Sequence, residues 1–270
     1  MARIHAAVSE LGALDDLASL DSPVHRLDPR AKVLVTAAFL VTAVSFPKCE
    51  IAELMPLCLY PVVLLSAGRV PLQMLARTLL LASPFAVMAG MFNPLLDREI
   101  AARWGALEVT GGWLSFFSIL IRFALTASAA LILLACTGYA SVCAALGRLG
   151  APRVLVAQFL LLYRFLFLLA GEAARMSRAH ALRSGTGRRP SIREWGGLAG
   201  NLLLRAFDRG SRVHAAMLVR GFDGTLPETR PMRWTAVDTA FVGLCLAFFA
   251  LARFGHPAER LGRFLLETIG

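Results

Sequence analysis

The feature that most constrains this chain is a set of long apolar runs separated by short polar segments. The clearest runs span 33–46, 51–67, 72–92, 113–137 and 236–252. Hydrophobic residues make up 57% of the 270 residues, and the excess over a soluble domain is concentrated in these runs. Runs of this length and composition are typical of membrane-spanning helices. We therefore predict an all-α, polytopic membrane protein with about five transmembrane helices.

The placement of positive charge predicts the topology, because loops rich in lysine and arginine stay in the cytoplasm. Arg26 and Arg30 lie just before the first run, and 172–233 holds twelve arginines against five acidic residues. Loops 47–50 and 93–112 are neutral or slightly acidic. Four crossings before the arginine-rich segment and one after it satisfy the rule. We expect a multi-pass protein of the cell inner (plasma) membrane with its N-terminus in the cytoplasm.

One further apolar run, 153–171, is ambiguous because it contains Gln158 and Arg164. An arginine at mid-bilayer depth costs about 2.5–3.5 kcal/mol on insertion scales. A fifth crossing at this point would also place the arginine-rich segment outside the cell. We expect a long helix that is buried in the protein or lies at the membrane surface, with a sixth membrane span as the alternative.

These patterns divide the chain into five parts. We expect, in order, a cytoplasmic N-terminal segment, four transmembrane helices, a cytoplasmic helical domain, the last transmembrane helix and an amphipathic C-terminal tail that could rest on lipid; the bounds are 1–31, 32–137, 138–233, 234–255 and 256–270.

The residue patterns of common catalytic and metal sites are missing from the sequence. Lys32 and Lys48 are the only lysines and neither follows a glycine, so no phosphate-binding loop of an ATPase is present. The five histidines and five cysteines show no H-x-H, H-x-x-x-H or C-x-x-C pairing. Glu53, a carboxylate within the second run, lies near its outer end, where interfacial solvation accounts for it. We expect a non-catalytic chain without a metal site or cofactor, and because topology explains the net charge of +10, no nucleic-acid partner.

Within the arginine-rich segment, the pattern predicts two helices joined by a short turn. The first spans about 153–183 and is stopped by Ser184 and Gly185. The second spans about 192–220 and is stopped by Gly221. Glycine just past a helix end is the usual left-handed cap. The predicted fold therefore has a cytoplasmic helical hairpin between the fourth and fifth transmembrane helices.

Each helix of this hairpin carries an arginine in its last turn. Favourable interaction with the helix dipole, of about 0.3–1 kcal/mol, is one explanation. The alternative is that each guanidinium pairs with a carboxylate in the groove of a partner protein. The similar strings AHALRSG and AAMLVRGF favour two equivalent partners. The residues that we assign to the two tips and their flanks are Leu182, Arg183, Ser184, Gly185, Val219, Arg220 and Gly221.

The second helix of the hairpin has two faces. Arg205, Arg209 and Arg212 follow one another at helical spacing, and Leu203 and Phe207 lie toward another side. Contact of the basic face with anionic membrane lipid is the simpler explanation of this pattern.

At this point the chain resembles a known family. The two arginine-centred helix ends, the four apolar runs before them and the one after them are similar to the transmembrane T component of energy-coupling-factor transporters, closest to the cobalt-type CbiQ family. The string HRLDPRAKVL at 25–34 is similar to that family's sequence before its first helix. The resemblance covers about 24–252. Here Leu182 and Val219 precede the arginines, where vitamin-type members often have alanine.

The resemblance implies a mechanism and partners. Arg183 and Arg220 would dock into grooves on two cytoplasmic ATP-binding cassette subunits, which hydrolyse ATP. Movement of these helices would reorient a separate substrate-binding membrane (S) subunit, which holds cobalt or nickel. The expected function is therefore energy coupling in an ion importer that supplies cobalamin biosynthesis.

Two alternatives remain open from the sequence. The first keeps the T component but assigns it to a vitamin importer, because the substrate is held by another subunit. The second is a membrane-embedded enzyme that modifies a lipid. Such an enzyme needs convergent acids near a membrane face, and Asp97, Glu99 and Glu108 of one outer loop show no known spacing.

Overall fold

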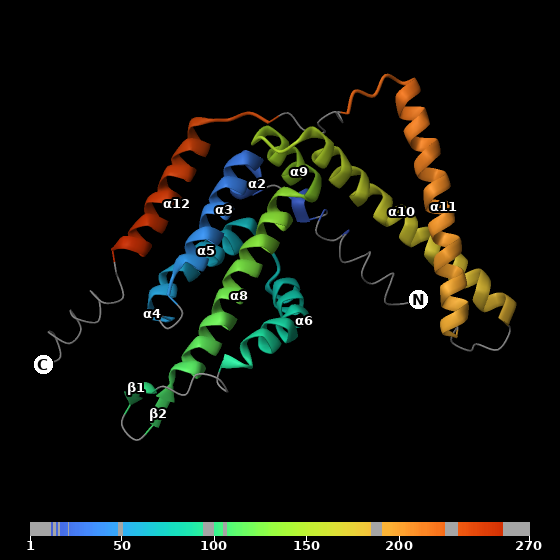
Figure 1. Ribbon diagram of the computed structural model, residues 1–270. Coiled ribbons are helices and arrows are strands. Elements are labelled where there is room, and N and C mark those ends of the chain that lie inside the picture. Colours follow the sequence, from blue (N-terminus) through green and yellow to red (C-terminus); the bar gives the residue numbers. More distant parts are fainter. Residues whose placement is uncertain are drawn as a thin grey trace, which may run out of the picture. The chain divides into compact units, whose positions relative to one another are not determined.

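The structure is a computed structural model (Figure 1). The residues that it describes are 12, 15, 17–20, 22–47, 51–93, 100–104, 107–184, 191–224 and 232–255. They fall into two compact units. The bundle unit comprises Leu17–Gly138 and Met232–Gly270, and the inserted unit comprises Tyr139–Pro231 together with Met1–Asp16. Each unit is described by itself.

The bundle unit is helical, with one short hairpin in its described part. Its elements are α2 Pro23–Arg26, α3 Pro29–Ser45, α4 Ile51–Leu54, the 3-10 turn η1 Pro56–Cys58, α5 Leu59–Gly68, α6 Leu72–Gly90, β1 Ile100–Trp104, β2 Leu107–Thr110, α8 Gly111–Thr137 and α12 Ala236–Phe254. The antiparallel pair β1–β2 lies in the loop between α6 and α8 and was not predicted from the sequence.

Helices α3 and α8 form the centre of the bundle unit. α3 packs against α8 and α12, and α8 also packs against α5 and α6. Phe39 of α3, fully buried, has its ring centroid 4.6 Å from that of Tyr60 and 5.6 Å from that of Phe249. The three rings come from α3, α5 and α12, so the cluster links these helices. Aromatic pairs of this kind stabilise a fold beyond the burial of apolar area alone.

The predicted second run, 51–67, is helical but not continuous. Pro56 divides it into α4, η1 and α5, since proline lacks the amide hydrogen and its ring clashes with the preceding turn. The third, fourth and last predicted runs are the continuous helices α6, α8 and α12. The all-α membrane fold predicted from the sequence is thus confirmed in its described part, apart from the short hairpin.

Four described helices are long and apolar enough to cross a membrane, namely α6, α8, α10 and α12. α3 has 17 residues, somewhat fewer than the roughly 20 of a typical span. α10 contains the ambiguous run 153–171. Within the described chain the side chains of α10 are mostly exposed or half-buried, and only Ala157 and Ala174 are buried. Burial inside the described part of this chain therefore does not explain why the run 153–171 is apolar.

The inserted unit contains α9 Tyr139–Arg148, α10 Arg153–Ser184 and α11 Ile192–Val219. α10 packs against α9 on one side and α11 on another. The two long helices agree with the predicted 153–183 and 192–220. α9 was not predicted; its amphipathic residues follow Gly138 directly. α11 begins with a capping box, in which Ser191 and Glu194 bind each other's backbone amides.

Candidate coupling surface

The tip of α11 ends in a glycine-capped turn that places Arg220 at its surface. Arg220 is the C-cap, and Gly221 follows with φ of +76°. The Gly221 amide donates to the Leu218 carbonyl at 3.0 Å, and the Phe222 amide donates to the Met217 carbonyl at 3.0 Å. This pair of hydrogen bonds is a Schellman motif, which requires a left-handed residue at Gly221. The cap predicted from the sequence is therefore present.

The tip of α10 carries Arg183 in its last turn, as predicted. The Arg183 Nε donates to the Ala179 carbonyl at 3.3 Å, and the Ser184 hydroxyl donates to the Ala181 carbonyl at 3.1 Å. The Ala181 carbonyl is one of the last four of α10, which lack an amide partner within the helix, so the Ser184 hydroxyl satisfies one of them. The Arg183 guanidinium binds a carbonyl one turn back, and interaction with the helix end accounts for part of its placement. Gly185 lies outside the described residues.

Large apolar side chains stand exposed beside both arginines. Leu182 is 79% exposed and Val219 is 89% exposed. Neither side chain is buried against the described part of the inserted unit. Each tip therefore presents a guanidinium and an apolar side chain next to each other at the surface.

Glu172 joins the two helices behind the tips. Its carboxylate accepts from Arg175 of α10 at 2.5 Å and from Arg205 of α11 at 2.6 Å. Hydrogen bonds from Arg175 and then Arg205 lower the pKa of this carboxyl, which lies beyond the apolar run of α10. Sequence reasoning missed this pair, because 33 residues separate its members, and it assigned Arg205 to a basic face with Arg209 and Arg212. The structure gives Arg205 a partner within the chain.

The other sequence motif, 25–34, lies in the bundle unit at the start of α3. Asp28 is the N-cap, accepts from the Arg30 amide at 2.9 Å and pairs with its guanidinium at 3.0 Å. The Asp28 amide in turn donates to the Asp238 carboxylate at 2.8 Å. Lys32 is buried and donates to the Cys136 carbonyl at 2.9 Å. The motif therefore joins α3 to α12 and α8.

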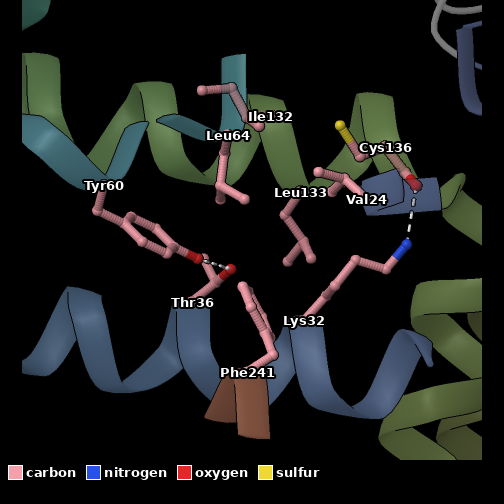
Figure 2. A pocket seen from close by; sticks show the side chains of 9 residues that line it. All are labelled: Val24, Lys32, Thr36, Tyr60, Leu64, Ile132, Leu133, Cys136 and Phe241. Atoms are coloured by element: carbon pink, nitrogen blue, oxygen red, sulfur yellow. Dashed lines mark hydrogen bonds between the residues drawn. The ribbon is translucent and has the colours of Figure 1, made fainter. Parts of the chain in front are cut away.

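A small pocket lies beside this motif (Figure 2). Its lining is mostly apolar, with Lys32 and the hydrogen-bonded pair of Thr36 and Tyr60, whose oxygens are 3.0 Å apart. Across the described residues, no group of three or more His, Cys, Asp or Glu could hold a metal ion. A lysine ammonium and an apolar wall do not suit a divalent cation, so the pocket is not a candidate metal site.

Helices that pack through α3 and α8, together with four helices able to span a membrane, define a polytopic helical membrane protein. A family model for the cobalt transport protein CbiQ matches residues 21–232. The chain belongs to this CbiQ family of transporter membrane components.

Curated relatives agree with the family. The chain is 30% identical over 227 residues to the cobalt transport protein CbiQ of Rhodobacter capsulatus, covering 81% of this chain and 87% of that protein. It is 27% identical over 251 residues to the energy-coupling factor transporter transmembrane protein EcfT of Thermotoga maritima, covering 88% and 91%. An uncharacterised protein of Methanocaldococcus jannaschii is 34% identical over 79 residues, which cover 29% of this chain and only 30% of that protein.

Proposed function

We propose that this chain is the energy-coupling T component of an ATP-driven importer for cobalt or nickel ions. The observation that carries the proposal is the pair of helix tips, each with an exposed arginine beside an exposed apolar side chain, in a member of the CbiQ family. The relative in Rhodobacter capsulatus is a cobalt transport protein by name, which favours an ion over a vitamin.

In the proposed mechanism, Arg183 and Arg220 dock into grooves on two ATP-binding cassette subunits. A guanidinium forms two parallel hydrogen bonds with a carboxylate, and Leu182 and Val219 cover the pair from water. Closure of the ATPase subunits then moves α10 and α11. The ion pair of Glu172 with Arg205 links the two helices, and in this mechanism their motion reaches a separate substrate-binding membrane subunit that holds the ion.

The bundle unit supports a cytoplasmic position for the tips. The end of α8 and the start of α12 are each hydrogen-bonded to the start of α3, which supports a position of all three at the same membrane face. The chain between α8 and α12 therefore crosses the membrane an even number of times. α11 is not apolar enough to cross and α9 is too short, so we infer that α10 does not cross alone. The excess of arginine near this face supports a cytoplasmic position for it in an inner-membrane protein.

The test is a double variant, Arg183→Glu with Arg220→Glu, in the chain co-expressed with its neighbouring ATPase and membrane subunits. We expect the ATPase subunits to be lost from a mild-detergent preparation, because like charges then face the grooves, while the thermal unfolding of the chain is unchanged. The matched control is Arg178→Glu with Arg209→Glu, which makes the same charge change at exposed positions within the same helices and should keep the ATPases bound.

Retention of both ATPase subunits by the tip variant would contradict the proposal. Uptake of radioactive cobalt, nickel and vitamins by the intact complex separates the ion importer from a vitamin importer. A chemical activity of the isolated chain on membrane lipid, without any ATPase, would favour an enzyme instead.

A further inference from the structure

The chain passes between the two units at three points, after Asp16, after Gly138 and before Met232, and buried polar contacts lie next to the last two. The chain leaves the bundle unit after Gly138, whose φ is +77°, and returns at Met232. Cys136 and Asp238 each lie within a few residues of these points. Both are bound by the same short segment, the first turn of α3.

Near Met232, where the chain returns to the bundle unit, both carboxylate oxygens of Asp238 accept hydrogen bonds. It is 2% exposed. Its Oδ1 accepts from the Asp28 amide at 2.8 Å, and its Oδ2 accepts from the amide and the hydroxyl of Thr235 at 2.8 and 2.7 Å. A buried carboxylate is stable only when it is paired in this way. The start of α12 is therefore fixed to the residue that caps α3.

Near Gly138, where the chain leaves the bundle unit, Lys32 binds the last turn of α8. Its side chain is buried, the residue being 5% exposed, and its Nζ donates to the Cys136 carbonyl at 2.9 Å (Figure 2). A cation at a helix C-terminus is favoured by the helix dipole. One turn of α3 thus holds the end of α8 and the start of α12 together.

Stability alone does not explain two buried charges at this place. A hydrophobic pair of the same volume is often as stable or more stable, because charges lose solvation when they are buried. Hydrogen bonds with fixed donors and acceptors instead specify one geometry. Here they fix the spacing of two of the three points at which the chain passes between the inserted unit and the bundle unit.

We propose that Asp28, Lys32 and Asp238, which we name the α3 clasp, are positioning residues that transmit movement of the inserted unit to α3, α8 and α12. The inference rests on the proposed coupling function. Because the clasp joins two of these three points, their displacement moves three bundle helices as one body. Without the clasp, α8 and α12 would yield separately, and the ATPases would turn over without moving the substrate-binding subunit.

The test measures cobalt uptake and ATP hydrolysis together in the complete complex, reconstituted in liposomes, for Lys32→Met and for Asp238→Asn. Each change removes a buried, charge-assisted hydrogen bond. We expect cobalt taken up per ATP hydrolysed to fall about tenfold, while the ATPase rate and the subunit composition of the complex stay near those of the unchanged protein. Lys32→Arg, which retains a cation, should recover most of the ratio.

Thr36→Val is the matched control. It removes the buried hydrogen bond to Tyr60, one turn further along α3, and should leave the ratio unchanged. If Asp238→Asn does not accumulate, Arg30→Gln replaces it, because Arg30 braces the Asp28 carboxylate from a more exposed position. If uptake, ATPase rate and yield all fall in parallel at constant ratio, the clasp is only structural and the inference is wrong. If the unchanged complex shows no ATP-dependent uptake, the proposed function fails instead.

Discussion

Replacing Gly221 with alanine tests whether the cap of α11 controls the presentation of Arg220. Gly221 has φ of +76°, and a Cβ built at this position meets no atom within 4 Å. The cost of alanine is therefore backbone strain alone. An L-residue in the left-handed region costs about 1–2 kcal/mol, which changes the equilibrium between the capped and frayed helix end by about 5–30-fold.

Hydrogen exchange of the Phe222 amide measures the equilibrium between the capped and the frayed end of α11, because that amide donates to the Met217 carbonyl only in the capped turn. We expect its protection in Gly221→Ala to fall by the factor above, and binding of the ATPase subunits to weaken in the same direction. Gly221→Asn should show a smaller loss, since asparagine tolerates the left-handed region better than alanine.

Gly197→Ala provides the matched control. Gly197 lies in the interior of α11, does not have a positive φ, and likewise has open space around a built Cβ. Alanine there should stabilise the helix by about 0.8–1 kcal/mol and leave ATPase binding unchanged. Unchanged protection of the Phe222 amide in Gly221→Ala would refute the reasoning from the left-handed cap.

Two further predictions concern the bundle unit. Arg69 ends α5 with φ of 52°, so Arg69→Gly should raise the free energy of unfolding by about 1 kcal/mol in a thermal or denaturant melt, whereas Arg69→Ala should not. A Cβ at Gly68 would lie 2.6 Å from the Cys136 sulfur, so Gly68→Ala should lower the melting temperature by the equivalent of about 1–3 kcal/mol. Adding Cys136→Ala should recover part of that loss, and no recovery would argue against close packing of α5 on α8.

Local signals predicted the long helices and their ends. Gly221 marks the end of α11, since left-handed caps favour glycine, and the apolar runs became α6, α8 and α12. The sequence analysis did not predict that Pro56 interrupts the second run, because prolines in membrane helices are often tolerated. The tip residues Arg183 and Arg220 were found because helix ends have a sequence signature. What they bind stays a prediction.

Contacts between distant residues left no local signal. Asp28 and Asp238 are 210 positions apart, and no periodicity relates them. The sequence also gave no reason to single out Arg122 within the fourth run, although its guanidinium donates to the Pro47 carbonyl beyond the end of α3. From the sequence, Lys32 was considered as a candidate for a phosphate-binding loop, yet it is buried at a helix end. Such roles depend on tertiary packing, which composition does not encode.

The α3 clasp has a consequence for the order in which the protein is made. Asp28 is synthesised early, but its partner Asp238 leaves the ribosome 210 residues later, after the whole inserted unit. Until α12 is made, Phe39 of α3 is not covered by Phe249, and the Asp28 amide lacks its acceptor, the Asp238 carboxylate. We expect a nascent chain that stops before α12 to remain an open bundle and a substrate for membrane proteases, since exposed apolar surface marks unfinished proteins. Completion of α12 is therefore the step that we expect to close the bundle unit.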